Sequence, residues 1–293
     1  MNHITPAEFL SLKSLVDERL ESLVSEVDSE HLRHIMRHTL AGGKRVRPLM
    51  TMIACSAVGG AERDALDAGV AIELLHTSSL AHDDIMDGSE TRRGRDTVHM
   101  RYGIPSAILT GDAMIALAFS VLQRTESARK GEIFEAFTRA FLALCEGQSD
   151  DLAFTGNSGV EVHAHRRMVV KKTAKLLEAA TLIGALIGTD DERLHSAMAE
   201  FGLKIGVAYQ AHDDLLDVLG SEEVLGKPVG VDARNKKQTF LTIMNGEIDT
   251  LARVSAIVGE CTTSACHALD MLYESQARES LRALAGSLVG REM

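Results

Sequence analysis

Two stretches of the chain carry the same arrangement of carboxylates. Residues 81–87 read Ala-His-Asp-Asp-Ile-Met-Asp, and residues 211–217 read Ala-His-Asp-Asp-Leu-Leu-Asp. An apolar helical pattern precedes each stretch, so each is expected to end a helix. Residues four apart are neighbours on one helix face, so Asp83 and Asp87 stack there, and the second stretch repeats that spacing. Each stretch therefore gathers negative charge at a helix end.

Stacked carboxylates of this kind need a partner of opposite charge. They repel one another, and they also oppose the negative end of the helix dipole. Hard oxygen ligands, few per ion, are typical of Mg²⁺ that keeps several waters and binds substrate phosphates. Two near-identical boxes favour this interpretation over a solvated acidic helix end, and no EF-hand loop pattern supports a calcium site. The sequence thus predicts two magnesium-binding boxes.

Cationic side chains accompany both boxes, as phosphate recognition requires. Near the N-terminus a glycine break precedes three cations, but the pattern of a P-loop is missing there. Any single cluster is compatible with a solvated surface. A diphosphate bridged by Mg²⁺ to the aspartates and held by Arg and Lys explains all of them together. The clusters are Gly42-Gly43-Lys44-Arg45-Val46-Arg47-Pro48, Arg92-Arg93-Gly94-Arg95, Lys171-Lys172, Lys227 and Lys237.

Helical signals dominate the chain between these motifs. Pro6 after Thr5 is typical of a helix start, and apolar residues then recur at steps of three and four from Phe9 onward. Glycine-containing breaks separate long segments rich in Ala and Leu, and no convincing period-2 strand is present. The sequence therefore predicts one all-α domain over residues 1–293, with a functional loop at 219–238. The long helical segments are 106–124, 132–147, 165–188 and 192–218.

Composition excludes several classes of protein. The formal net charge is −11, which argues against general affinity for nucleic acid because that requires a basic face. The four cysteines form no Cys-x-x-Cys pair, so neither a zinc site nor a disulfide framework is indicated. The N-terminus lacks the basic-then-apolar pattern of a signal peptide, and no uncharged apolar run reaches the roughly 18 residues of a membrane span. We expect a cytoplasmic protein without stable membrane insertion.

Histidines near these motifs are candidates for supporting roles. His82 and His212 recur inside the boxes, where they either orient the aspartates or simply pack. The other clustered histidines are expected at the surface. They are His31, His34 and His38, which share a helix face, and His163 and His165, which lie near a glycine break.

These motifs together resemble the trans-isoprenyl diphosphate synthases, the polyprenyl synthetase family. Several motifs fall in the family's order, and the resemblance covers most of the chain before residue 246. It implies a bundle of long helices around a deep central cavity, a homodimer, and two boxes that face each other across the cavity mouth. Besides the basic segments, the matching motifs are Asp83-Asp84-x-x-Asp87, Gly147-Gln148, Lys172-Thr173, Gln210 with Asp213-Asp214-x-x-Asp217, and Gly226-Lys227.

The resemblance implies how a diphosphate would be held. Asp83 and Asp87 would bind two Mg²⁺ ions on an allylic diphosphate, and Asp213 would bind a third ion. Asp84 and Asp217 would support these metal ligands. The side chains implied for the same allylic diphosphate are Arg92, Lys172, Lys227 and Lys237, and those implied for isopentenyl diphosphate are Lys44, Arg47, His76 and Arg93.

The resemblance also implies the reaction. Loss of diphosphate from the allylic substrate would leave a cation, which the alkene of isopentenyl diphosphate attacks before a proton is lost. Lys172, Thr173 and Gln210 would be the catalytic residues, and the last two would present oxygen dipoles to the cation. An apolar helical cavity would exclude water and accept the growing tail.

The chain departs from the family pattern in one place. After Gly226-Lys227 the family often has Gly-Lys-x-Thr and then Pro, whereas residues 235–241 read Asn-Lys-Lys-Gln-Thr-Phe-Leu. This departure bears on the role of Lys237. The region after about residue 246 matches no motif of the family.

Small residues precede the first box, and they bear on product length. Ser78 and Ser79 lie about one helical turn before it, where the tail of the product would pass. A bulky aromatic residue there would shorten the pocket, so the sequence predicts a product of geranylgeranyl length or longer. The candidates for the cavity floor are Ala71, Leu75 and Phe119, and a farnesyl diphosphate synthase is the alternative.

Two further functions stay open at this point. A terpenoid cyclase or a head-to-head synthase of the same class normally carries one Asp-rich box and a different second metal motif. A non-catalytic subunit of a synthase tends to lose box aspartates. The second intact box and the Gly-Gly-Lys-Arg segment favour chain elongation over both.

Overall fold

The structure is a computed structural model that describes residues 6–157, 159–219, 237–244 and 249–290. It is an all-α fold, as the sequence predicts. The helices are α1 (Pro6–Ser25), α2 (Glu30–Leu40), α3 (Val46–Ala57), the 3₁₀ turn η1 (Glu62–Ala65), α4 (Leu66–Met86), α5 (Val98–Tyr102), α6 (Ile104–Leu122), α7 (Lys130–Phe154), α8 (Val162–Val169), the π-helical turn η2 (Val170–Ala174), α9 (Lys175–Gly188), α10 (Glu192–Leu219), α13 (Phe240–Ile243), α14 (Thr250–Leu269) and α15 (Gln276–Val289). Most of the predicted loop, including Lys227, lies outside the described residues.

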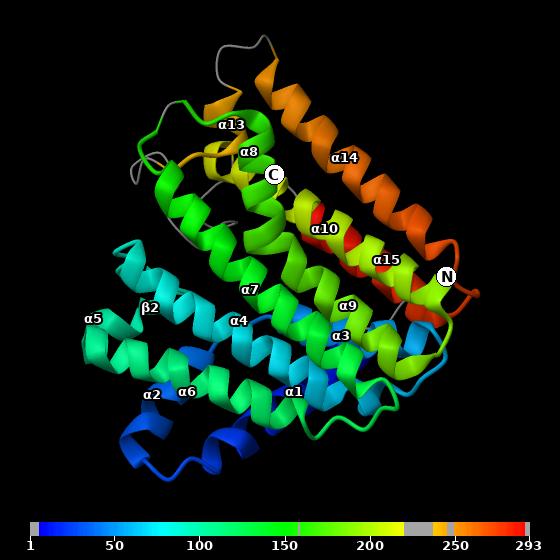
Figure 1. Ribbon diagram of the computed structural model, residues 1–293, viewed down its shortest axis with the longest axis horizontal. Helices are drawn as coiled ribbons and strands as arrows, with labels where there is room; N and C mark the ends of the chain where they lie inside the picture. Colours follow the sequence, from blue (N-terminus) through cyan, green and yellow to red (C-terminus); the bar gives the residue numbers. More distant parts are fainter. Residues whose placement is uncertain (1–5, 158, 220–236, 245–248, 291–293) are drawn as a thin grey trace.

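Helix α9 occupies the middle of the bundle. It packs against α3, α7 and α10 and shows apolar side chains on nearly every face, which is typical of a core helix. Figure 1 shows α9 between α7 and α10. Glycines allow these close contacts, since a Cβ on Gly184 would lie 2.9 Å from the Cβ of Ala54 in α3, and one on Gly202 would lie 2.8 Å from the Cα of Glu178. One cluster of buried apolar side chains runs from Leu12 to Leu288.

The N-terminal half contains a buried charge cluster. Arg45 is 6% exposed and donates to Asp17 at 2.7 Å and to Glu73 at 2.9 Å, and it also donates to the carbonyl of Leu40. These bonds use the donors of its guanidinium inside the fold. Arg45 therefore ties α1, α3 and α4 together, whereas Lys44 beside it is exposed.

A short antiparallel hairpin follows the first box, and the sequence pattern did not predict it. Strands β1 (Thr91–Arg92) and β2 (Arg95–Asp96) pair in register through Arg92 and Arg95. The two residues between them, Arg93 and Gly94, have φ of 53° and 70°, as a type I′ turn requires. Two-residue strands are too short to show a period-2 pattern, which is why the pattern was absent.

The segment predicted as one helix over 165–188 is divided. The turn η2 interrupts it, so α8 and α9 are separate helices that share a widened π turn. The C-terminal region, which matched no motif, forms two helices that complete the bundle, since α14 packs on α10 and α15 packs on α3.

Helix α6 has an unusually apolar composition. Among the described residues it is the one helix long and apolar enough to cross a membrane, with a mean hydropathy of 1.6 in its most apolar window. About a third of that window (33%) is buried inside the fold, and Asp112 lies within it. One such helix is weak evidence for a membrane span, because core helices of globular proteins pass the same test.

Candidate active site

The first box ends α4 in a cluster of opposite charges. Asp83 lies in the last full turn and Asp87 is the C-cap residue. The ammonium of Lys172, from η2, is 3.6 Å from Asp83 Oδ1, and the ammonium of Lys237 forms an ion pair with Asp87. The structure thus brings together four predicted site residues from three segments that are far apart in the sequence.

Asp151 joins the two lysines, and the sequence analysis did not single it out. It lies in α7, is 5% exposed, and its Oδ2 is 2.6 Å from Lys172 Nζ and 3.7 Å from Lys237 Nζ. Burial alone would lower the pKa of Lys237, but the carboxylates of Asp151 and Asp87 outweigh it and raise that pKa. The ammonium of Lys237 is therefore held charged, and both ammonium groups lie close together beside the first box. The sequence feature that could have indicated Asp151 is its position one helical turn after the Gly147-Gln148 motif.

The π turn brings Lys172 and Thr173 into the site. Wide π turns of this kind are frequent at functional sites. Two glycines let neighbouring helices approach it: a Cβ on Gly147 of α7 would lie 2.7 Å from the Cα of Lys172, and one on Gly206 of α10 would lie 2.7 Å from the Cβ of Ala174. Gly147 belongs to the Gly147-Gln148 motif. The close packing of α7 against η2 requires a glycine at this position.

Thr173, which follows Lys172 in η2, is linked to the second box by a chain of hydrogen bonds. Its hydroxyl donates to Gln210 Oε1 at 3.0 Å, and Gln210 Nε2 donates to Asp214 Oδ1 at 3.0 Å. Asp214 Oδ2 accepts from the main-chain N–H of Phe240 at 2.8 Å. This last bond anchors α13 to α10, three residues after Lys237. The predicted catalytic residues Lys172, Thr173 and Gln210 thus lie in one continuous cluster.

The second box lies at the other end of this chain. Asp213 is half-buried, and Asp217 is buried near the end of α10. Asp213 also acts on the basic side of the site, since burial lowers the pKa of Arg47 and the negative charge of Asp213 partly offsets that effect. The two boxes are therefore connected through η2, and Asp213 also acts electrostatically on Arg47.

Arg92 and Asp84 form a pair behind the first box. Arg92 Nε and Nη2 both reach Asp84 Oδ1, at 2.8 and 2.7 Å. Burial alone would lower the pKa of Arg92, but the hydrogen bond and charge of Asp84 outweigh it and raise that pKa. Asp84 is almost fully buried, and its ion pair holds Arg92 of β1 against the end of α4.

A second basic group lies around Arg47. Its Nη1 is 3.0 Å from His76 Nε2, and because arginine has only donors, His76 must accept. Burial, followed by the charges of Arg47 and Arg93, lowers the pKa of His76 well below its usual value. His76 is therefore neutral and orients Arg47. Arg93 lies against Gly42 and Gly43, which brings the hairpin to the Gly-Gly-Lys-Arg segment.

The residues predicted to set product length lie in two different environments. Ser78 is almost fully buried in α4 and donates to the carbonyl of Leu75, and Ser79 donates to the carbonyl of His76. Both hydroxyls donate their hydrogen within their own helix. An apolar chain that passes them therefore leaves neither donor without a hydrogen-bond partner. Phe119 contacts Phe137 edge to face, with ring centroids 5.3 Å apart.

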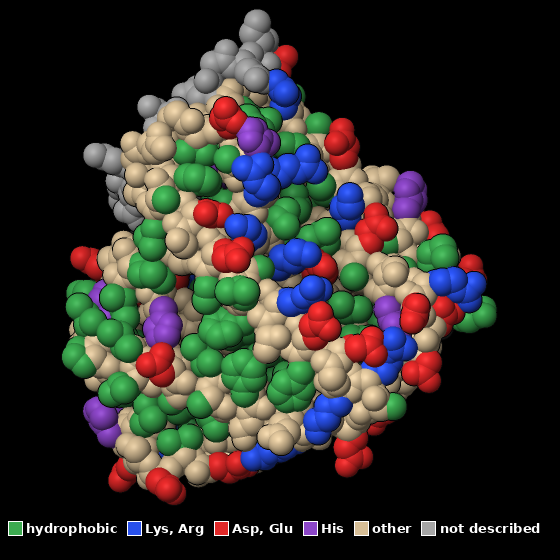
Figure 2. Space-filling model, in the orientation of Figure 1, with side chains coloured by type: hydrophobic (Ala, Val, Ile, Leu, Met, Phe, Trp, Pro, Cys, Tyr) green, Lys and Arg blue, Asp and Glu red, His purple; other side chains and the backbone are tan. Residues whose placement is uncertain are grey.

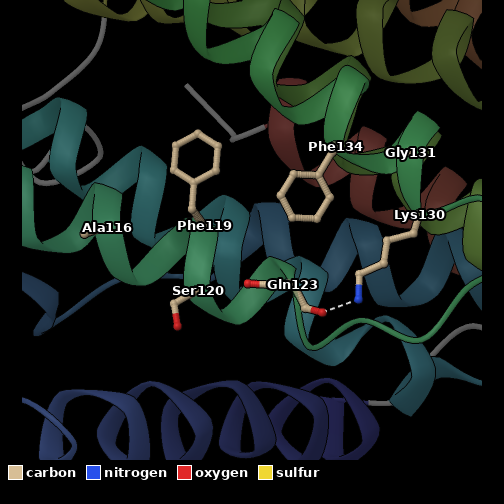
Figure 3. Close-up of a pocket in the computed structure, with 7 residues that line it drawn as sticks. All are labelled: Ala116, Phe119, Ser120, Gln123, Lys130, Gly131 and Phe134. Carbon is tan, nitrogen blue, oxygen red and sulfur yellow. Dashed lines mark hydrogen bonds between the residues drawn. The ribbon is translucent and has the colours of Figure 1, made fainter.

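Phe119 also lines an open groove between α6 and α7 with a volume of about 650 Å³. Figure 3 shows Phe119 and Phe134 on its two sides, with the ammonium of Lys130 donating to the carbonyl of Gln123 at one end. The groove opens to the surface of the chain. As a floor for the tail cavity, Phe119 stays a prediction.

His31, His34 and His163 are exposed as expected, but His165 lies in a different environment. His165 was expected at the surface, but it is buried, its Nε2 is 3.0 Å from the carbonyl of Gln238, and its ring packs on Phe240. The contact that buries it comes from a segment 73 residues away, which local pattern does not reveal. His82 is 3.2 Å from the carbonyl of Ile108 in α6 and lies over Gly111, so the structure shows it packing there.

Comparisons with known proteins show the family of the chain. The family model described as polyprenyl synthetase matches residues 29–278. The short chain isoprenyl diphosphate synthase of Methanothermobacter thermautotrophicus is 35% identical over 311 aligned residues, which cover 95% of this chain and 96% of that protein.

Solved structures give the same result. The geranylgeranyl pyrophosphate synthetase of Pyrococcus horikoshii superposes with a TM-score of 0.92 at 36% identity, over 97% of this chain and 98% of that one. A polyprenyl synthase of Caulobacter crescentus, solved with calcium and isoprenyl diphosphate, superposes with a TM-score of 0.86 at 27% identity, over 97% and 94% of the two chains. The chain therefore belongs to the polyprenyl synthetase family and is a trans-prenyl diphosphate synthase.

Proposed function

We propose that this enzyme lengthens an allylic diphosphate by head-to-tail condensation with isopentenyl diphosphate, and that its product is geranylgeranyl diphosphate or longer. The observation that carries the proposal is the pairing of half-buried Lys172 and Lys237 around Asp151, directly beside Asp83 and Asp87. Two fixed ammonium groups next to two carboxylates that favour metal suit a diphosphate with its counter-ions. The same two lysines hold that diphosphate in the proposal.

The first box fits a divalent cation. Asp83 Oδ1 is buried and makes no hydrogen bond, although the Lys172 ammonium lies 3.6 Å away. Within the described ranges no three His, Cys, Asp or Glu side chains form a ready-made cage for an ion. This suits Mg²⁺, which keeps waters and takes phosphate oxygens as ligands. Asp83, Asp87 and Asp213 would hold these ions, which neutralise the charge of the departing diphosphate when bound.

The side chains of the enzyme supply the remaining parts of the reaction. Lys172 and Lys237 bind the allylic diphosphate, whose carbon–oxygen bond breaks with the electron pair leaving on oxygen. The oxygens of Thr173 and Gln210 face the carbon that becomes cationic. A new bond then forms between that carbon and the terminal alkene carbon of isopentenyl diphosphate, and a proton passes to the released diphosphate.

The second substrate needs its own cations. Arg47 lies in the first turn of α3, Lys44 just precedes that helix, and Arg93 of the hairpin turn lies against Gly42 and Gly43; in the proposal these three cations bind the isopentenyl diphosphate. Neutral His76 fixes Arg47 by accepting its hydrogen bond. Arg92, paired with Asp84, reaches the allylic diphosphate in the proposal. Buried apolar residues of α4 before the box, such as Ile72, Leu74 and Leu75, exclude water from the cation.

The way in which the five-carbon units are joined in the product, and the geometry of the new double bonds, test this proposal. Incubation with Mg²⁺, labelled isopentenyl diphosphate and an allylic primer, followed by phosphatase treatment, should give a linear alcohol with new trans double bonds in its NMR spectrum. A cyclic product or a head-to-head product would show that the two boxes serve a different reaction of the same class.

Product length should change when the small residue before the first box is enlarged. Replacing Ser78 with Tyr places a ring about one turn before the metal-binding carboxylates, so the tail should stop after fewer five-carbon units. Chromatography of the dephosphorylated products measures this. Ser78→Ala, which keeps the side chain small, should leave the length unchanged. A folded Ser78→Tyr enzyme with an unaltered product would contradict the proposed path of the tail.

The exposed apolar face of α6 supports a second copy of the chain as partner. Ile104, Ile108 and Leu109 of α6 and Leu142 of α7 are between 45% and 62% exposed, and Figure 2 shows apolar side chains gathered over these helices. Leu109→Glu should shift a dimer toward the monomer in sedimentation, while Leu251→Glu, an equally apolar exposed position on α14, should not. A Leu109→Glu protein with unchanged mass in solution would contradict this interface.

A further inference from the structure

We infer that Asp214, the second aspartate of the second box, acts through Gln210 and fixes which end of the Gln210 amide faces the reacting carbon. The inference rests on the proposed function, which places the allylic carbon beside Thr173 and Gln210. Asp214 is 3% exposed, and both of its oxygens accept hydrogen bonds from groups of this chain. Its role therefore differs from that of its neighbour Asp213.

The chemistry of the acceptor decides the orientation of the amide. A carboxylate has only acceptor sites, so it can pair with the NH₂ end of an amide and not with the oxygen end. Asp214 Oδ1 lies 3.0 Å from the Gln210 amide, while Oδ2 is taken by the main-chain N–H of Phe240 at 2.8 Å. Gln210 must turn its NH₂ group toward Asp214, and its oxygen consequently points the other way.

The orientation of the Gln210 amide in turn fixes the orientation of the Thr173 hydroxyl. The oxygen of Gln210 accepts the hydroxyl hydrogen of Thr173 at 3.0 Å. A threonine hydroxyl has one hydrogen, so the lone pairs of Thr173 then remain for another partner. The chain of bonds from Phe240 to Thr173 thus presents two oxygen atoms, each with its negative end already oriented, to a developing positive charge. Such dipoles need no reorganisation when the charge forms, which is what makes them effective.

Asp214 also accepts a hydrogen bond from the main chain of Phe240. The effect of this bond on the site has to be distinguished from the effect of the bond to Gln210. Its bond to Phe240 anchors the start of α13, and Lys237 lies three residues earlier. His165 holds the same segment through the carbonyl of Gln238. An effect through Lys237 would weaken every diphosphate ligand equally. An effect through Gln210 would weaken only ligands with positive charge at the reacting carbon.

The substitution Asp214→Asn separates these possibilities with a change of one atom type. The oxygen of Asn is needed by Phe240, so its NH₂ group faces Gln210 and forces that amide to turn over. The positive end of the amide then faces the cation. We expect kcat to fall on the order of 100-fold with little change in KM for isopentenyl diphosphate.

Ligand affinity gives the readout that a merely structural role would not move. The probes are an ammonium analogue of the allylic diphosphate, with a protonated nitrogen at the cationic carbon, and an unreactive allylic thiolodiphosphate. In Asp214→Asn the first should bind on the order of 10- to 100-fold more weakly, while the second is nearly unchanged. Asp270→Asn on α14's C-cap is the matched control and should alter neither affinity.

A double-substitution cycle shows whether Gln210 carries the effect. Gln210→Met removes the amide dipole at nearly the same size, so adding Asp214→Asn to it should cause no further loss of affinity for the ammonium analogue. Equal losses with and without Gln210 would overturn the inference. So would equal losses for both probes, because that result assigns Asp214 to the Lys237 segment.

The orientation itself is visible without any variant. In the ligand-free wild-type protein, NMR should show a Gln210 side-chain amide that exchanges slowly with water and is shifted by its bond to Asp214. A fast-exchanging amide would overturn the inference even if Asp214→Asn fails to fold. Wild-type protein that elongates no primer would instead overturn the proposed function, so the two failures are distinguishable.

Discussion

Replacing Asp83 or Asp213 with Ala should nearly abolish turnover. Each substitution removes one of the three predicted metal ligands, so the ions that would neutralise the diphosphate are bound more weakly. Ions at such sites supply several kcal/mol of transition-state stabilisation, so kcat should fall by about 10³-fold or more. Steady-state kinetics with saturating Mg²⁺ and both substrates measures the loss.

A second readout distinguishes lost metal from lost structure. Added Mg²⁺ with inorganic diphosphate should raise the melting temperature of the wild-type protein, and this shift should shrink in both variants. Asp64→Ala, in η1 at the opposite end of α4, should keep full activity and the full shift. If Asp83→Ala or Asp213→Ala retained near-full turnover, the assignment of these ligands would be wrong.

Gly147→Ala should damage both stability and catalysis although it adds one carbon. The new Cβ would lie 2.7 Å from the Cα of Lys172 in the π turn and closer still to its nitrogen. Both are backbone atoms, so α7 and η2 must separate. Overpacking of this kind costs about 1–3 kcal/mol, and a shift of roughly 1 Å in Lys172 costs about 100-fold in rate. Denaturant unfolding and kcat measure the two effects.

The matched control is Gly259→Ala on α14. Gly259 also lies inside a long helix, but nothing lies within 4 Å of a Cβ added there. Alanine favours the helix, so this variant should gain about 0.5–1 kcal/mol of stability and keep its activity. Gly147→Ala with wild-type stability and rate would show that the contact between α7 and η2 is not needed.

The sequence could predict those parts of the site that depend on the spacing of residues within one short segment. Each Asp box carries its own spacing, and each helix its own period and glycine break, so the boxes and most helices followed from pattern alone. Lys172, Thr173 and Gln210 were assigned by resemblance to a family. The hydrogen bonds that join Thr173 and Gln210 to Asp214 follow from the packing of η2 against α10.

The parts that sequence could not predict depend on contacts between distant segments. Asp151 becomes the counter-ion of two lysines because η2 and the residues before α13 both reach α7. Arg45 looks like the other cations of its cluster, but Glu73 and Asp17 draw it into the fold. His165 is buried by Gln238 and Phe240, far along the chain. In each case the partner, and not the residue's own pattern, decides the role.

Product analysis with each allylic primer in turn tests the central claim most directly. With Mg²⁺ and labelled isopentenyl diphosphate, the dimethylallyl, geranyl and farnesyl primers should each be extended, and label should accumulate in an allylic diphosphate of geranylgeranyl length or longer. Chelation of the metal should stop the reaction. If purified protein elongated no primer from dimethylallyl to geranylgeranyl diphosphate, the account of this site as a chain-elongating centre would be contradicted.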